Sequence, residues 1–131
     1  MLIRFLCCYT YIIHHGALLV KQYRINMYIN KDLIMPGVHR NNDSRACGAA
    51  TQSSSVRVRV NGRDIVLQGD NNSHGGGPLR ASVTNVRANG KPIIILNNSA
   101  APDSLCGVIG HGGHGHCNPK ATSASGDVFA G

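Results

Sequence analysis

The sequence predicts a small all-β protein stapled by a metal ion, and three observations favour this fold. Two Asn-Gly pairs, Asn61-Gly62 and Asn89-Gly90, lie between runs of alternating or β-branched residues, as in tight β-hairpins. No segment of useful length repeats its apolar residues with a helical period. Beyond Met35 the chain holds no Trp, no Tyr and a single Phe, and so small a core usually needs a metal, disulfides or a partner subunit.

The first 34 residues differ from the rest and are left outside the predicted fold. Met1–Val20 is apolar, but Arg4 and a pair of histidines interrupt it, and the apolar stretch is too short for a membrane span. No small-residue cleavage site of the usual kind follows it. We therefore expect residues 1–34 to be an upstream extension and residues 35–131 to form one domain that begins at Met35-Pro36.

The first hairpin is expected on either side of Asn61-Gly62. Valines and arginines alternate over residues 56–60, which places the valines on one face of a strand. After the turn, Ile65–Leu67 continues the sheet. The Asn-Gly pair suits a type I′ turn because both of its central positions need a positive φ.

The second hairpin is expected around Asn89-Gly90, where it joins Val83–Arg87 to Ile93–Leu96. Its second strand has four apolar residues in a row, which indicates a strand covered on both faces. Pro92 comes just past the turn, where the start of a strand tolerates a missing N–H group.

These hairpins belong to a predicted internal repeat. Each copy opens with a residue that can bind a metal, passes through sequence rich in Ser, Thr or Ala, and closes on a strand before Gly. An aspartate recurs just upstream of Cys47, His74 and Cys106. Three copies predict pseudo-threefold symmetry, which would bring Cys47, His74 and His116 to one point. The copies are Cys47–Gly62, His74–Gly90 and His116–Gly131, and the upstream acids are Asp43, Asp70 and Asp103.

The segment Cys106–Cys117 is dense in potential metal ligands, separated by glycines that let the backbone turn sharply. The chain has five cysteines, and this odd number beside so many histidines favours metal binding over a disulfide framework. A structural zinc ion takes four nitrogen or sulfur ligands. For His39 we expect a structural role, because nothing nearby in the sequence completes a site. The four ligands are expected from Cys47, His74, one of His111, His114 and His116, and Cys106 or Cys117.

Other chemistries fit the sequence less well. No Glu occurs anywhere, and a catalytic zinc site commonly uses Glu as its general base, so we expect no enzyme. From Met35 onward the chain has nine basic and five acidic residues, but the basic residues form no continuous run. Phe129 is the only aromatic residue there, so nucleic-acid binding is not expected.

Several motifs resemble those of the PAAR-repeat family, the conical tips of contractile injection machines. Met35-Pro36, followed by an aspartate at Asp43, resembles the start of these proteins. The resemblance covers residues 35–131 and is closest to the small spike-tip members of T4-like phage baseplates, which carry no fused effector. The repeated strand unit resembles Val58-Arg59-Val60-Asn61-Gly62-Arg63 and Val86-Arg87-Ala88-Asn89-Gly90-Lys91-Pro92, and a second motif resembles Asp70-Asn71-Asn72-Ser73-His74-Gly75-Gly76.

The resemblance implies a small conical, three-sided pyramid of short hairpins with a metal near its apex. The implied ion is zinc, with iron less favoured. The implied function is a structural tip that caps a trimeric β-helical spike as a monomer and pierces the host outer membrane in transient contact. Such a protein is made in the host cytoplasm and is carried in the virion, at the tip of the tail baseplate spike. The implied ligands are Cys47, His74, Cys106 and His116, with His111, His114 and Cys117 as rivals.

Two alternatives stay open beside the phage tip. The same fold can serve as the PAAR tip of a type VI secretion spike, where it would recruit effectors. A candidate of another class is a small zinc-dependent nucleic-acid-binding protein, which would retain DNA in a salt-dependent way.

Overall fold

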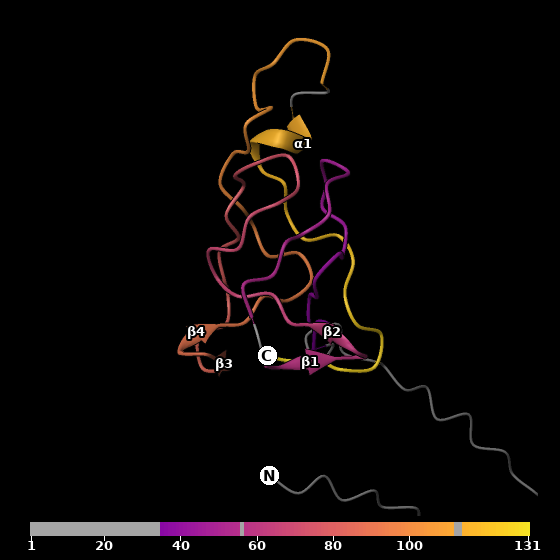
Figure 1. Cartoon of the computed structure of the whole chain (residues 1–131), viewed down its shortest axis with the longest axis vertical. Helices are drawn as coiled ribbons and strands as arrows, with labels where there is room; N and C mark the ends of the chain where they lie inside the picture. The colour runs from indigo at the N-terminus through magenta and orange to yellow at the C-terminus, as the bar shows by residue number, and fades with distance from the viewer. Residues whose placement is uncertain (1–34, 56, 112–113) are drawn as a thin grey trace, which may run out of the picture. The chain divides into compact units, whose positions relative to one another are not determined.

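The computed structural model describes residues 35–55, 57–111 and 114–131, apart from the side chain of His114. These residues fall within a single contact unit, Lys31–Gly131, whereas the expected extension 1–34 lies outside the described residues. The described chain is mostly non-helical, with two small antiparallel hairpins and one short helix, which is compatible with the predicted all-β class (Figure 1).

Both predicted hairpins are confirmed at their turns. Asn61 and Gly62 have φ angles of 52° and 74°, and Asn89 and Gly90 have 51° and 76°. These left-handed backbone conformations are the ones that Asn and Gly tolerate best. The strands are β1 (Arg59–Val60), which pairs antiparallel with β2 (Arg63–Asp64), and β3 (Arg87–Ala88), which pairs antiparallel with β4 (Lys91–Pro92).

The strands are much shorter than the sequence predicted. Beyond its two paired residues each hairpin keeps one more backbone bond, from Ile65 N to Val58 O at 3.0 Å and from Ile93 N to Val86 O at 3.1 Å. The chain then pairs with distant segments. Ile65 forms an antiparallel bridge with Arg40, and Leu67 forms one with Ile93. The apolar residues after each turn therefore extend the hairpin by one bond and otherwise form single bridges between different parts of the chain.

The backbones of three segments close into a ring of hydrogen bonds. The N–H group of His39 donates to the carbonyl of Ile94 at 2.9 Å, Ile94 donates to Val66 at 2.9 Å, and Val66 donates back to His39 at 3.0 Å. The flanking residues form three bridges in the same cyclic order. Those bridges are Arg40 with Ile65, Leu67 with Ile93, and Ile95 with Val38.

Each of the three segments ends in the same kind of turn. An Asp or Asn side chain accepts the backbone N–H group three residues earlier, and its own N–H group donates back to the carbonyl of that earlier residue, as in a β-turn. The residue just before that acid or amide has a positive φ, of 63°, 93° and 67° in chain order. The three bonds are Arg40 N to Asp43 Oδ2 at 2.8 Å, Leu67 N to Asp70 Oδ2 at 2.8 Å, and Ile95 N to Asn98 Oδ1 at 3.1 Å.

The hydrophobic core is small and divides into two clusters. Side chains alternate along each extended segment, so that Ile93 and Ile95 pack in one cluster while Ile94 packs in the other. The hairpins cover the first cluster, with Val60 and Ala88 in contact with it. The first cluster is Val38, Ile65, Leu67, Ile93, Ile95 and Ala130, and the second is Val66, Leu79, Ile94, Ala100 and Ala121.

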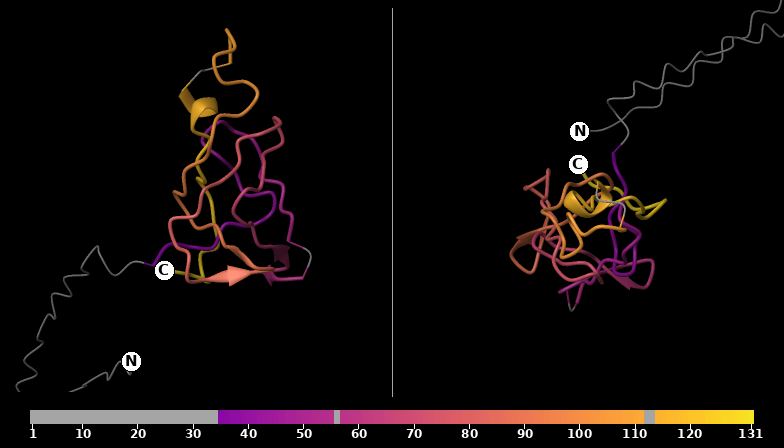
Figure 2. Two further views of the ribbon diagram at one scale, coloured as in Figure 1. Left: turned by 90° about the vertical axis from the view of Figure 1, so that its left-hand side faces the viewer. Right: turned by 90° about the horizontal axis from the view of Figure 1, so that it is seen from above.

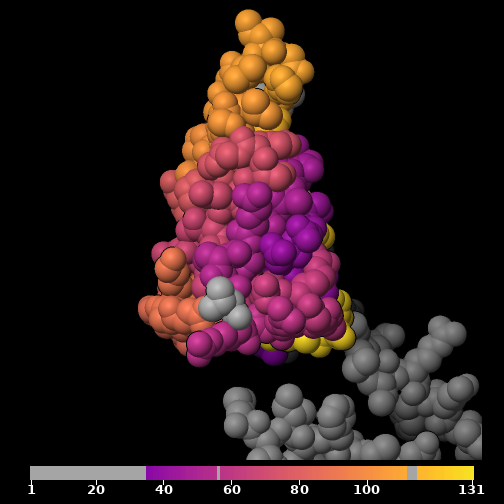
Figure 3. Space-filling view, viewed as in Figure 1, coloured from indigo at the N-terminus to yellow at the C-terminus, as the bar shows by residue number. Residues whose placement is uncertain are grey.

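The hairpins and the helix α1 (His114–Cys117) lie toward opposite ends of this unit. Figures 1 and 2 show β1 to β4 together at one end, near the C-terminus, and α1 toward the other. The segment that precedes α1, coloured orange, projects beyond it as a narrow knob (Figure 3). We call the region of β1 to β4 and the first cluster the hairpin end.

Candidate metal centre

Four side chains near α1 bring metal-binding atoms together. Cys47, His74, Asp103 and His116 each offer one such atom, and these atoms all lie within 4.8 Å of one another. Together they supply a thiol, two imidazoles and a carboxylate, a donor set that could hold a metal ion. We call this group the four-donor cluster and the region around it the cluster end.

Tight turns present Cys47 and His74. Gly48, which follows Cys47, has a φ of 79°, and its N–H group donates to the carbonyl of Arg45 at 2.9 Å. The N–H group of His74 donates to Oδ1 of Asn72 at 3.0 Å, and the N–H group of Gly75 donates to the Asn72 carbonyl at 3.1 Å. Both side chains are therefore fixed by turns with local hydrogen bonds and not by long secondary structure.

Asp103 and His116 are held against each other by main chain and side chain. The N–H group of Asp103 donates to the carbonyl of His116 at 2.9 Å, and Nδ1 of His116 lies 3.1 Å from both carboxylate oxygens. Asn72 also donates to Oδ2 of Asp103, at 2.9 Å. Burial alone would raise the pKa of Asp103, but hydrogen bonds from His116, Asn72 and Leu105 outweigh it and lower the pKa to about 2. Asp103 is therefore an anion at neutral pH.

One nitrogen in the cluster lacks a partner among the described residues. Nδ1 of His74 is buried and makes no hydrogen bond there, and Oδ2 of Asp103 is 3.7 Å away. Buried polar atoms are nearly always satisfied in native proteins. A cation bound among the four donors would supply the missing interaction, so the residues present fit a metal ion.

The protonation state of Cys47 makes ion binding sensitive to pH. Burial raises the pKa of the Cys47 thiol, and the Asp103 carboxylate raises it further. Since a metal binds the thiolate, binding must displace the thiol proton. The amide of Asn72 is 3.7 Å from Sγ of Cys47 and contacts Asp103 as well.

A buried arginine lies behind the cluster. Nη2 of Arg45 donates to the carbonyl of Asp70 at 2.9 Å, Nε donates to Oγ1 of Thr51 at 2.8 Å, and Nη1 donates to the carbonyl of Gly77. Burial lowers the pKa of Arg45 to about 10, although Cys47 and other acids nearby counteract the effect. Arg45 thus remains a cation and ties three parts of the chain together.

The structure departs from the expected ligand set at Cys106. Cys106 forms a disulfide with Cys117, so neither of these sulfurs belongs to the four-donor cluster, and Asp103 stands where a second thiolate was expected. His111 is exposed, and its ring centroid is 6.4 Å from that of His116. The side chain of His114, another expected rival, lies outside the described residues.

Asp103 and the supporting Asn72 were missed as site residues. The sequence groups Asp103 with the recurring upstream acids, but Asn98 and not Asp103 makes the third turn of this kind. The available signal was the position of Asp103, three residues before Cys106 and outside the turn pattern. Asn72 offers no signal in the sequence beyond its place two residues before His74.

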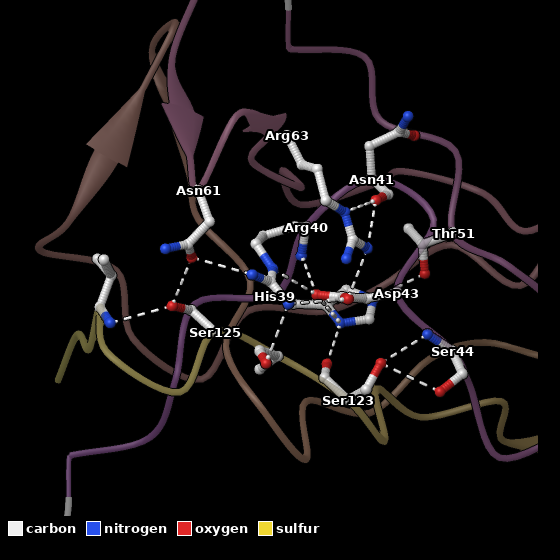
Figure 4. Close-up of polar contacts among 12 residues, drawn as sticks. His39, Arg40, Asn41, Asp43, Ser44, Thr51, Asn61, Arg63, Ser123 and Ser125 are labelled. Atoms are coloured by element: carbon white, nitrogen blue, oxygen red, sulfur yellow. Dashed lines mark hydrogen bonds and ion pairs between the residues drawn. The ribbon is translucent and has the colours of Figure 1, made fainter.

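A second polar group, around His39 and Asp43, is a network of hydrogen bonds and ion pairs (Figure 4). The buried Asp43 carboxylate accepts from Arg40 at 3.1 Å and from Arg63 at 2.6 Å. Burial alone would raise the pKa of Asp43, but the Arg40 hydrogen bonds and both arginine charges lower it below its ordinary value. The two guanidinium groups already neutralise this carboxylate.

His39 belongs to this network and has the structural role expected for it. Its Nδ1–H group donates to the carbonyl of Ser123 at 2.6 Å, and Nε2 is 2.7 Å from Oγ1 of Thr51 (Figure 4). Since Arg45 can only donate to Thr51, the Thr51 hydroxyl is free to donate to Nε2 of a neutral His39. The ring therefore links three segments as a neutral imidazole.

Comparisons with known proteins identify no relative. The sequence matches none of the protein-family models and none of the curated proteins with which it was compared. Among the described residues, no helix has the length and apolar character that crossing a membrane requires. The function proposed below therefore rests on the geometry of the chain and on its sequence motifs.

Proposed function

We propose that residues 35–131 form a PAAR-like structural tip that caps the trimeric β-helical spike of a contractile phage tail. The observation that carries the proposal is the ring of backbone hydrogen bonds among His39, Val66 and Ile94. Three segments joined head to tail in one cycle support a pseudo-threefold axis, the symmetry that a monomer needs in order to fit the end of a trimer.

A second set of contacts supports the same symmetry nearer the cluster end. Three backbone bonds run between segments in the same cyclic order, and three isolated bridges accompany them. The same cyclic order of bonded segments thus occurs at a second level of the unit, as expected for a three-sided pyramid. The bonds are Ala46 N to Lys120 O at 2.9 Å, Ser73 N to Ala50 O at 2.9 Å and Ala101 N to Pro78 O at 3.0 Å.

The hairpin end offers the surface for the partner. Phe129 is 48% exposed and Val58 40% exposed, although most large apolar side chains of a small protein are buried. Both line an apolar hollow between the hairpins and the C-terminal residues, together with Val60, Val86 and Ile93. We propose that this face rests on the end of the spike, with the four-donor cluster toward the far end.

The proposed ion is zinc, held by Cys47, His74, Asp103 and His116. Zinc accepts sulfur, nitrogen and oxygen donors in a tetrahedron, and four protein ligands leave no open position for a substrate. The ion's role is then structural, in a chain with two small apolar clusters. Elemental analysis of the purified protein checks this: less than about half an equivalent of zinc or iron would contradict it.

Co-purification with a trimeric β-helical spike protein tests the capping function. Phe129→Asp is expected to abolish the complex, because the substitution places a charge in the proposed interface. Ile109→Asp is the matched control, since Ile109 is 99% exposed on the knob at the other end and should leave the complex intact. Equal retention of both variants, or no complex with the unaltered protein, would refute the proposed cap.

A further inference from the structure

We propose that Cys106 and Cys117 form a redox-gated metal site, separate from the four-donor cluster, that binds a zinc-class ion when their disulfide is reduced. In the oxidised protein the two sulfurs are joined to each other and offer no thiolate. Reduction creates two thiols on one short loop. Thiolates are the ligands for which zinc, cadmium and similar soft ions have the highest preference.

The backbone already holds the two cysteines at chelating distance. Their Cα atoms are 4.7 Å apart. Two thiolates on one tetrahedral zinc lie about 3.8 Å from each other, so the sulfurs must separate by roughly 2 Å relative to the disulfide. Hydrogen bonds keep both ends of the loop in place without the disulfide, because Cys106 N donates to the Asp103 carbonyl at 3.2 Å and Asp103 N donates to His116 at 2.9 Å.

The position of the pair suits exchange with solvent. Cys117 is exposed and Cys106 is half-buried, so a small reductant and an ion can both reach the sulfurs. No Lys, Arg, Asp or Glu occurs between Ser104 and Pro119, so no charged side chain of this stretch competes for the ion or the thiolates. His111 is exposed on the same loop and supplies the imidazole that we assign as the third ligand.

The redox step balances with ordinary thiol chemistry. A dithiol reductant attacks the Cys106–Cys117 bond through a mixed disulfide, leaves as a cyclic disulfide, and yields the two protein thiols, which lose their protons to the solvent on binding the ion. In the reverse direction a low-molecular-weight disulfide accepts two electrons, becomes two thiols, and re-forms the protein S–S bond. Re-formation of that bond removes both sulfur ligands and releases the ion.

Cadmium titration of the full chain that carries Cys7→Ser and Cys8→Ser tests the site, because thiolate-to-cadmium absorption counts the sulfur ligands and only Cys47, Cys106 and Cys117 then remain. The disulfide form is expected to bind one ion through a single thiolate, that of Cys47. After reduction by a phosphine without oxygen, we expect a second ion and a threefold larger thiolate absorption. A low-molecular-weight disulfide should then release one of the two ions to a chromogenic chelator. One ion in both states overturns the proposal, whatever the number of thiolates.

Two variants separate this site from the four-donor cluster. Cys106→Ser leaves a single thiol on the loop and should bind one ion in either state; a second ion in its reduced form would overturn the need for a pair. Cys47→Ser should lose the cluster ion and still gain one on reduction. If the oxidised protein binds no ion while the reduced protein binds one, the proposed structural ion fails and this inference stands.

The assignment of His111 has its own test. In the reduced protein, His111→Ala should lower the affinity for the second ion by roughly tenfold or more. Loss of a residue that only hydrogen-bonds to a metal ligand already costs about that much. An unchanged affinity would remove His111 from the site.

Discussion

The hairpin end and the cluster end of this protein are held together in different ways. At the hairpin end, Val38, Ile65 and Ile93 pack in an apolar cluster under two β-hairpins. At the cluster end, Cys47, His74 and His116 surround a buried carboxylate, Asp103. Apolar packing stabilises in proportion to the area removed from water, whereas an ion bound among the polar donors would offset the cost of burying them. The two ends should therefore respond to different perturbations.

The largest expected effect comes from the ion. Zinc at a thousandfold excess over its dissociation constant should raise the free energy of unfolding by about 4 kcal/mol. His116→Ala removes a ligand and should abolish this gain, as measured by urea unfolding with and without zinc. The exposed His111 lies outside the cluster, so the oxidised His111→Ala variant should keep the full gain; equal responses of the two variants would place the ion elsewhere.

The second-largest effect on the free energy of unfolding is expected from packing in the middle of the fold. Ile94 is fully buried and belongs to the ring of three backbone bonds. Ile94→Ala should lower the free energy of unfolding by about 3 kcal/mol, through lost burial and the cavity left behind. Ile109→Ala removes the same atoms from a side chain that is 99% exposed, and denaturant unfolding should show a change of less than about 0.5 kcal/mol. Similar losses in both would contradict the assigned core.

Gly77 lies beside Asn72 and Asp103 at the cluster end, and its substitution should give a smaller effect. A Cβ atom there would lie 2.8 Å from Nδ2 of Asn72 and 2.9 Å from Cγ of Pro119. Gly77→Ala should therefore cost about 2 kcal/mol and weaken zinc binding, because Asn72 supports the cluster. Gly48 also has a positive φ but has open space around its Cβ position, so Gly48→Ala should cost only the backbone strain of about 1 kcal/mol. Calorimetric zinc titration and thermal unfolding of both variants separate strain from crowding.

The smallest expected effect is a pH dependence that arises at His39. Burial lowers the pKa of His39, against the opposing effects of the Ser123 carbonyl and the Asp43 carboxylate. Above about pH 6.5 the folded and unfolded chains both carry a neutral ring. As the pH falls through this value the unfolded chain gains the proton first, so the free energy of unfolding decreases by up to about 1.4 kcal/mol per pH unit.

The metal-free His39→Gln variant isolates this contribution. Glutamine can keep a hydrogen bond to Ser123 or Thr51 but cannot take up a proton near neutral pH. The difference between the unaltered protein and the variant, in urea unfolding from about pH 7 to pH 5, should therefore follow the titration of one group. Parallel pH profiles of the two proteins would exclude His39 as the source.

The sequence allowed the local features to be predicted better than the distant pairings. Asn61-Gly62 and Asn89-Gly90 form the turns that they predict, because the preference for positive φ belongs to the two residues themselves. The strands were predicted too long, since Ile65 bonds to Val58 but also bridges to Arg40, and Leu67 pairs with Ile93. Such pairings depend on how three segments meet, which no short pattern of apolar residues expresses.

The ligand prediction shows the same division. The spacing of the repeated units led to Cys47, His74 and His116, and the structure brings these three side chains together. The choice between Cys106 as a ligand and as half of a disulfide depends on whether its nearest sulfur is Cys117 or Cys47, which is a property of the folded loop. The sequence alone is compatible with both pairings of Cys106.

The ring formed by His39, Val66 and Ile94 sets a limit on how this fold can change in evolution. A solenoid with open ends can grow by duplication, because each added repeat needs only one neighbour. Here every segment of the ring already uses both of its neighbours, so a fourth segment would have no place to join and loss of one would leave two unpaired edges. The architecture is closed to lengthening, and new sequence can enter only through its loops or beyond its ends.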